Sequence, residues 1–197
     1  MRKPILALTL LLTLFGSSIT AHAGYLGLPN GRTADLTRLP DLSIEAGFVT
    51  GDFSDVDYQN LGLRLNYRLS PGLMLLADLG LVEIGSFDET AVGLGVYYAM
   101  GGLLEDYDTA LKFSYNTADD FDVMALEMVV SGLNPISSSG LMWYGNLGLH
   151  RSDGGDSDTD LGFGAGVVLP LESGEAYLGV DMIGDLTFGI GYRYFYQ

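Results

Sequence analysis

The chain has 197 residues, no cysteine, and 25 acidic against 9 basic residues, so its formal net charge is −16 at pH 7. This charge would repel a polyanion such as nucleic acid, and a chain without cysteine has no disulfide framework and no thiolate metal site. Hydrophobic residues make up 48% and charged residues only 17%, with 28 glycines and 12 tyrosines. That composition is unusual for a water-soluble domain.

The first 23 residues are typical of a secretory signal peptide. They begin with two basic residues, continue with an apolar run over residues 5–15, and end in the small-x-small sequence Ala21-His22-Ala23. We therefore expect Sec-type export and cleavage near Ala23. Residues 24–40 fall outside the pattern that follows, and we expect them to form either an N-terminal periplasmic tail or a plug that folds inward.

Apolar residues alternate with polar or small residues along almost all of residues 41–197. Leu61, Leu63 and Leu65, for example, are separated by a glycine and an arginine. A period of two that persists this long predicts strands rather than helices. We expect ten strands, with eight as the alternative, at residues 41–51, 58–69, 73–83, 90–100, 108–117, 121–131, 140–150, 160–169, 175–182 and 186–196.

The connections between these segments alternate in character. Turns such as Ser70-Pro71-Gly72 carry few charges, whereas every second connection is acidic, namely GDFSDVD, EIGSFDE, TADDFD and RSDGGDSDTD. In an up-and-down arrangement the acidic connections all lie on one side. With the low charge and strands of roughly ten residues, this sorting predicts an all-β fold, a transmembrane antiparallel up-and-down β-barrel over residues 41–197. A soluble sandwich is the alternative.

The last strand carries a more specific signal. In TFGIGYRYFYQ, Phe188, Ile190, Tyr192, Tyr194 and Tyr196 share one face. This stretch resembles the C-terminal strand of Gram-negative outer-membrane proteins, although that pattern normally ends on the aromatic residue and this chain adds Gln197. In pattern, the mature chain resembles the small barrels of the OmpX, Opa and OmpA-transmembrane type. The resemblance implies an outer-membrane location and recognition of the last strand by the barrel-assembly machinery.

Side chains opposite the leucine face are expected to line the barrel. The charged residues among them, the predicted lumen charge network, are Arg64, Arg68, Lys112 and Arg193 with Glu45, Asp78, Glu127 and Asp181. Unpaired charge is costly in a narrow interior, so four bases matched to four acids predict a plugged, hydrogen-bonded barrel. Inward glycines beside Tyr97, Tyr144 and Tyr177 are expected to let the rings pack against bare backbone, with a ligand cavity as the alternative.

Acidic residues crowd the acidic connections, where Arg151 alone opposes them. Such a rim would repel anionic lipopolysaccharide unless divalent cations bridge the two, and carboxylate oxygens suit Ca²⁺ and Mg²⁺. The candidate ligands are Asp153, Asp156, Asp158 and Asp160, although their spacing is not that of an EF-hand. A solvated acidic loop is the alternative. We expect no other cofactor.

An enzyme would need a nucleophile and a base, and His150 is the one histidine that remains after signal-peptide cleavage. His150-Arg151-Ser152 resembles part of the triad of outer-membrane lipid A deacylases, which implies His150 and Ser152 as catalytic candidates. That family also has a glutamate about a dozen residues beyond the serine, where this chain has Gly164. So little of the constellation is present that we expect no enzymatic activity.

The sequence therefore predicts a non-enzymatic outer-membrane β-barrel with a charge-balanced, plugged interior and acidic surface loops, in a structural or surface-interaction role. Two alternatives stay open. One is a narrow cation-preferring channel, which an acidic mouth would favour, and the other is a lipid A-modifying hydrolase built on His150. The expected partners are membrane lipid, lipopolysaccharide and the assembly machinery, and no nucleic acid.

Overall fold

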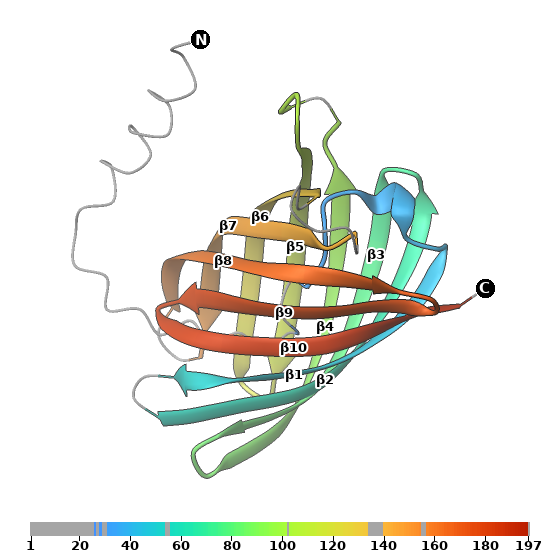
Figure 1. Cartoon of the computed structure of the whole chain (residues 1–197). Coiled ribbons are helices and arrows are strands. Elements are labelled where there is room, and N and C mark those ends of the chain that lie inside the picture. The colour runs from blue at the N-terminus through green and yellow to red at the C-terminus, as the bar shows by residue number, and fades with distance from the viewer. Residues whose placement is uncertain are drawn as a thin grey trace, which may run out of the picture.

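The computed structural model describes residues 26, 28, 31–53, 56–101, 103–133, 140–154 and 157–196, and the expected signal peptide lies outside them. Ten antiparallel strands form a closed barrel in which each strand pairs with its neighbours in sequence and β10 pairs with β1 (Figure 1). The strands are β1 Leu42–Phe53, β2 Val56–Ser70, β3 Leu73–Ile84, β4 Phe87–Ala99, β5 Asp108–Ala118, β6 Phe121–Leu133, β7 Met142–Asp153, β8 Ser157–Leu171, β9 Gly174–Ile183 and β10 Asp185–Tyr196.

The predicted fold class, an antiparallel up-and-down barrel of ten strands, is confirmed, and the eight-stranded alternative is wrong. Several strands are longer than expected. Both β2 and β8 have 15 residues. The reason is that backbone pairing continues through the acidic stretches, as where Asp52 pairs with Asp57. Residues expected in loops therefore form the ends of strands.

The two ends of the barrel differ, and we name them by their connections. The hairpin rim is the end where β1 meets β2, β3 meets β4, β5 meets β6, β7 meets β8 and β9 meets β10. The terminal rim is the opposite end, where β1 begins at Leu42 and β10 ends at Tyr196. Glycines with positive φ, Gly85 and Gly184, make two of the tight turns at the hairpin rim.

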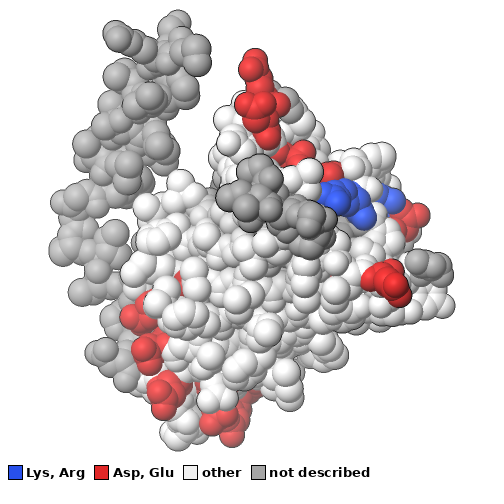
Figure 2. All heavy atoms as spheres, in the orientation of Figure 1, with Lys and Arg blue, Asp and Glu red and all other residues white. Residues whose placement is uncertain are grey.

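Many of the described acidic side chains lie at the hairpin rim. Figure 2 shows a group of red acidic side chains at the lower left, with others at the top and at the right, where the blue basic side chains visible in that view also lie. The acidic residues on the strand ends and turns of this rim are Asp52, Asp57, Glu83, Asp88, Glu89, Asp119, Asp120, Asp122, Asp153, Asp158 and Asp185. Asp55 and Asp156 lie outside the described residues.

The outward face of the strands is apolar, as the alternation predicted. Leu63 on β2, Leu94 on β4 and Phe163 on β8 are each at least 50% exposed, and every strand contributes apolar side chains to this surface. A monomer in water rarely exposes a continuous apolar belt of this kind, whereas the lipid-facing side of a membrane barrel requires one. None of the described helical residues forms a helix long and apolar enough to span a bilayer.

Outward aromatic side chains collect near the terminal rim. Tyr67, Tyr98 and Tyr194 lie near the ends of β2, β4 and β10. Trp143, at the start of β7, packs edge-on against Tyr107, with ring centroids 5.5 Å apart. Amphipathic rings of this kind favour the boundary between lipid and water, so these residues form one aromatic girdle.

Candidate functional site

Most of the described residues between 24 and 40 are buried inside the barrel. Leu26, Leu28, Arg32 and Leu36 are each at most 3% exposed. Leu26 belongs to a buried apolar cluster formed by side chains near the hairpin rim. Leu36 belongs to a second cluster, formed by side chains near the terminal rim. We call the described residues 26, 28 and 31–39 the interior segment.

The interior segment is long enough to pass through the whole barrel. Ten residue steps separate Leu26 from Leu36, and an extended chain of that length reaches at most about 33–36 Å. The hydrocarbon core of a bilayer is about 30 Å thick. Because the two leucines belong to the clusters at opposite rims, the segment runs from the hairpin rim to the terminal rim.

Strand side chains satisfy the backbone of the interior segment. Asn60 donates from Nδ2 to the carbonyl oxygen of Leu26 at 2.9 Å, and Arg64 donates from Nη2 to that of Leu28 at 3.1 Å. The carbonyl of Gly31 accepts from Arg193 Nη2 at 2.9 Å, and Ala34 N–H donates to Ser131 Oγ at 2.7 Å. A buried chain without regular pairing needs such partners, and these bonds fix the segment against three strands, β2, β6 and β10.

The interior segment ends in a short 3₁₀ helix, η1 (Leu36–Arg38), at the terminal rim. Asp35 caps this helix, because its Oδ1 accepts from the backbone N of Thr37 at 3.0 Å and from Thr37 Oγ1 at 2.6 Å. Arg68 donates to Asp41 Oδ1 from Nη2 at 2.7 Å and also reaches the Leu36 carbonyl at 3.3 Å. The chain is thus fixed in place just before β1 begins.

Around the middle of the interior segment, one carboxylate meets three guanidinium groups. Glu45 on β1 lies 3.2 Å from Arg32, 3.7 Å from Arg64 and 3.0 Å from Arg193. Two further carboxylates complete this group, which we call the Glu45 cluster. They are Asp78, a bidentate partner of Arg64, and Glu175, which accepts from Arg193 at 2.7 Å. Three cations are therefore balanced by three anions.

A second buried group, which we call the Lys112 cluster, lies on β5, β6, β7 and β9. Lys112 Nζ donates to Glu127 Oε2 at 2.6 Å. The amide Nδ2 of Asn146 donates to Glu127 Oε1 at 2.9 Å and to Asp181 Oδ1 at 3.2 Å, so one amide bridges two carboxylates. Buried ions persist only where hydrogen bonds of this kind satisfy their remaining atoms.

The predicted lumen charge network is divided between these two clusters, with one exception. Glu45, Arg64, Asp78 and Arg193 belong to the first cluster, and Lys112, Glu127 and Asp181 to the second. Arg68, expected in the lumen, instead lies at the terminal rim, where it pairs with the exposed Asp41. Arg68 is opposite the buried Met74 and so keeps the inward side of the β2 alternation, but it is the last residue to do so before the register shifts between Arg68 and Ser70.

Sequence reasoning missed three buried charged residues, namely Arg32, Glu175 and Asp160. Glu175 is two residues before the inward Tyr177, so the alternation of β9 could have placed it inside. Asp160 shares its inward face with Gly162 and Gly164 on β8 and could also have been found. Arg32 follows no alternation, and nothing in the sequence indicated its position.

Tyrosine rings fill much of the remaining interior by packing against glycines. A Cβ on Gly166 or Gly179 would collide with the ring of Tyr144, and a Cβ on Gly31 or Gly191 would collide with that of Tyr177. The glycines thus provide the space that the buried rings occupy, as predicted for these tyrosines. The same relationship holds for smaller groups, since a Cβ on Gly93 would overlap the side chain of Asn116.

The two catalytic candidates face the interior. His150 and Ser152 on β7 are only 1% and 3% exposed. His150 is directly opposite Asp160 on β8, and Ser152 is opposite Asp158. All four residues belong to the inward-facing set of strand positions, whereas a lipid substrate would contact the outward face. The strand register thus places a histidine, a serine and two carboxylates on the inward face, and all of them except Asp158 are buried.

The candidate metal ligands do not all face the same way. Asp153 is exposed, Asp158 is half-buried and Asp160 is buried beside His150. Among the residues that the structure describes, no group of three or more histidine, aspartate or glutamate side chains is arranged to hold a metal ion. Asp156 falls outside those residues, so the proposed ligand set is only partly described.

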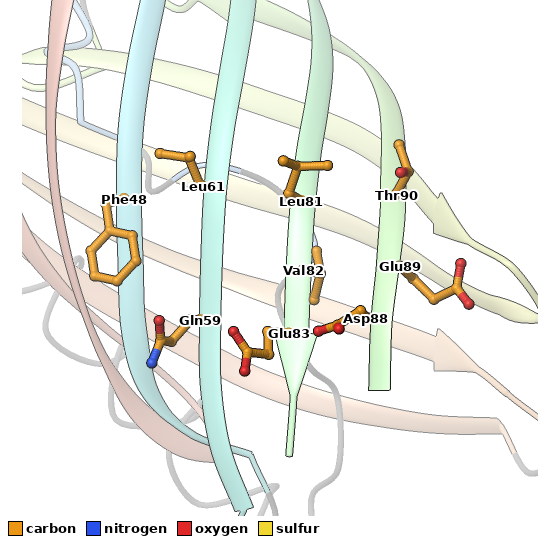
Figure 3. A pocket seen from close by; sticks show the side chains of 9 residues that line it. All are labelled: Phe48, Gln59, Leu61, Leu81, Val82, Glu83, Asp88, Glu89 and Thr90. Carbon is orange, nitrogen blue, oxygen red and sulfur yellow. The ribbon is translucent and has the colours of Figure 1, made fainter. Parts of the chain in front are cut away.

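A shallow hollow on the outward face marks where the apolar belt ends at the hairpin rim. Its lining includes Leu61, Leu81, Gln59, Glu83 and Asp88. Figure 3 shows the leucine side chains on one side of the hollow and the polar ones nearer the strand ends. Glu83 and Asp88 are directly opposite in the β3–β4 register. Two like charges so placed repel each other, which indicates that this row lies in water rather than in lipid.

No protein-family model matches the sequence, and no curated protein is significantly similar to it. Solved structures with a similar arrangement include the KdgM porin in complex with disordered oligogalacturonate, at 9% identity and a TM-score of 0.47, covering 79% of this chain and 99% of that chain. A de novo designed transmembrane β-barrel has 16% identity and a TM-score of 0.38, covering 80% and 98% of the two chains. The fold assignment rests on the strand pairing of the chain itself.

Proposed function

We propose that this protein is a non-enzymatic outer-membrane β-barrel whose interior is closed by its own N-terminal segment and whose acidic hairpin rim faces the cell surface. The apolar outward belt and the aromatic girdle near the terminal rim support a place in a membrane. An even number of strands puts the β1 start and the β10 end on the same side, which is the periplasmic side in bacterial barrels.

The observation that carries the proposal is the path of the interior segment. Its backbone is bonded to β2, β6 and β10, and the side chain of Arg32 adds Glu45 on β1, Asn66 on β2 and Met74 on β3. A barrel of about eight strands has an interior that side chains just fill, and ten strands leave only modestly more room. We expect a peptide that occupies this extra room from one rim to the other to block a continuous water path.

The buried charges and the apolar clusters both oppose withdrawal of the interior segment from the barrel. Withdrawal would remove Arg32 from the Glu45 cluster and leave a buried carboxylate without full compensation, which is costly in a poorly hydrated interior. It would also remove Leu26 and Leu36 from the two apolar clusters. The closed state is therefore the favoured one, and the exposed acidic rim is the surface left for interaction with lipopolysaccharide or other partners.

Single-channel recording of the refolded mature chain in a planar bilayer tests this proposal. Folding is verified in the same preparation from the shift in electrophoretic mobility between heated and unheated samples. We expect no steady conductance steps from folded protein. Steady cation-selective steps would overturn the closed-barrel proposal and favour the channel alternative, which the acidic hairpin rim would support by concentrating cations.

A further inference from the structure

Arg32 occupies a pocket whose walls suit a guanidinium group. Its Nη2 donates to Oε2 of Glu45 at 3.2 Å and to Oδ1 of Asn66, and its Nη1 lies 2.9 Å from the Sδ of Met74. The Cζ atom lies 5.3 Å from the centroid of the Tyr97 ring. Arg32 and all four of these partners are buried. The pocket thus combines one carboxylate, one amide oxygen, one thioether and one aromatic face.

This set of groups distinguishes between classes of cation. Mg²⁺ and Ca²⁺ are bound by oxygen ligands, water included, whereas two of the four groups around Arg32 are a thioether and an aromatic face. A thioether and an aromatic face are suited to a broad, weakly hydrated cation. Guanidinium is planar, stacks on aromatic rings and donates several hydrogen bonds in one plane. The pocket therefore favours guanidinium over a metal ion.

The charge count of the cluster points to the same conclusion. The members carried by strands are two cations, Arg64 and Arg193, and three anions, Glu45, Asp78 and Glu175. The barrel wall alone thus lacks one positive charge at this point, and Arg32 of the interior segment supplies it. Arg64 and Arg193 are held in the register of β2 and β10, whereas Arg32 comes from outside the sheet. Arg32 is thus the one cation of the cluster whose backbone takes no part in strand pairing.

Building on the closed barrel proposed above, we propose that this pocket is a guanidinium-recognition site, that Arg32 is its resting occupant, and that small solutes bearing a guanidinium group compete for it. The hairpin rim, with its many carboxylates, is the end at which such cations would collect. In this view the N-terminal segment is a tethered ligand of the barrel as well as its plug.

The test uses the mature chain with Arg32→Ala, refolded in vesicles of zwitterionic lipid and titrated with methylguanidinium chloride. The readout is the midpoint of thermal unfolding, followed through the fluorescence of Trp143. We expect a saturable increase in the midpoint. Methylurea, which is planar but neutral, and sodium chloride at the same concentration should give none, because neither provides a planar cation.

Two further variants test whether methylguanidinium binds in the pocket that Arg32 vacates. In Arg32→Ala with Glu45→Gln, binding of methylguanidinium should weaken by about tenfold, since a charge-assisted hydrogen bond contributes roughly that factor. Arg38→Ala is the matched control, because Arg38 belongs to the same segment but is exposed and lies outside the pocket. It should show no response. If Arg32→Ala does not refold in plain buffer, its refolding yield with and without methylguanidinium becomes the readout.

An equal response to methylurea or sodium chloride, or an unchanged response after Glu45→Gln, would overturn the guanidinium site. So would a refolding yield that methylguanidinium does not raise. These outcomes are separate from a failure of the closed-barrel proposal, which would appear as steady conductance of the unmodified mature chain. A silent unmodified chain together with no specific response of Arg32→Ala would reject only the guanidinium site.

Discussion

Arg193 on β10 donates a hydrogen bond from Nε to Oε2 of Glu45 on β1, at 3.0 Å. These two strands are the first and the last of the chain, and their pairing closes the barrel. Both side chains are fully buried, and both are also bound to the interior segment, through Arg32 and through the carbonyl of Gly31. One ion pair thus joins the closure of the sheet to the filling of its interior.

Removal of the Glu45 side chain should therefore lower the stability of the barrel strongly. Glu45→Ala leaves Arg32, Arg64 and Arg193 without their shared carboxylate, and loss of one partner of a buried ion pair typically costs about 3–5 kcal/mol. We expect the free energy of unfolding in lipid vesicles, measured by urea titration, to fall by about that amount.

The Arg68–Asp41 pair provides the control for this measurement. It is also an ion pair, at 2.7 Å, but Asp41 is largely exposed. An exposed pair contributes about 0–1 kcal/mol. Asp41→Ala, which removes this pair and leaves the bonds of Arg68 to the Leu36 and Thr37 carbonyls, should thus change the free energy of unfolding by less than about 1 kcal/mol. If both variants lose the same stability, burial does not decide the strength of these pairs.

The Lys112 cluster predicts strong coupling between two substitutions. Lys112→Met leaves Glu127 as a buried carboxylate without its cation, and Glu127→Gln leaves Lys112 without its anion. The double variant removes both charges, so its loss of stability should be smaller than the sum of the two single losses. A double-mutant cycle on urea unfolding should give an interaction energy of about 0.5–3 kcal/mol. Additive losses would show that the pair is not coupled.

Glycine packing gives a prediction that involves no charge. A Cβ on Gly191 would collide with Tyr177, which is buried and cannot move aside freely, so Gly191→Ala should lower the free energy of unfolding by about 1–3 kcal/mol. Gly101→Ala is the control, because a Cβ there would meet nothing within 4 Å. Tyr177→Leu in the Gly191→Ala background should recover part of the loss. Equal stability of the two alanine variants would reject the packing argument.

The number of strands and the inward or outward direction of their side chains could be predicted from the sequence, because a period of two persists through each strand. A shift by one residue would turn every leucine inward. The same rule places Lys112, Glu127 and Asp181 inside. It could not indicate which charges pair, since Arg64 bonds to Asp78 and Glu45 through cross-strand register rather than sequence spacing.

The position of the interior segment could not be predicted from the sequence. It has no alternation, because its backbone bonds to side chains such as Asn60 and Ser131 instead of to a neighbouring strand. No local pattern records such contacts, which depend on residues far away in the chain. Arg68 does share the inward face of β2 with Asn66, but it is the last inward residue before the register shift and it pairs at the rim with the exposed Asp41.

The hydrolase alternative predicts a change in lipid that we do not expect to see. His150 and Ser152 are buried on the inward face, which is not the face that the apolar belt presents to lipid. His150→Ala and Ser152→Ala should leave the mass profile of lipid A unchanged in cells that express each variant at the level of the unmodified protein. Loss of a modified lipid A species in either variant would overturn the non-enzymatic proposal.

The path of the interior segment can be tested by cross-linking, since the chain has no native cysteine. Ala34 N lies 2.7 Å from Ser131 Oγ, so Ala34→Cys with Ser131→Cys should form a disulfide on mild oxidation of the folded protein. In the control, Ala34→Cys with Val123→Cys, the second cysteine is also buried on β6 but lies near the hairpin rim. That pair should stay reduced, as should the first pair in the unfolded chain. Equal cross-linking of both pairs would show that the segment does not hold this position in the barrel.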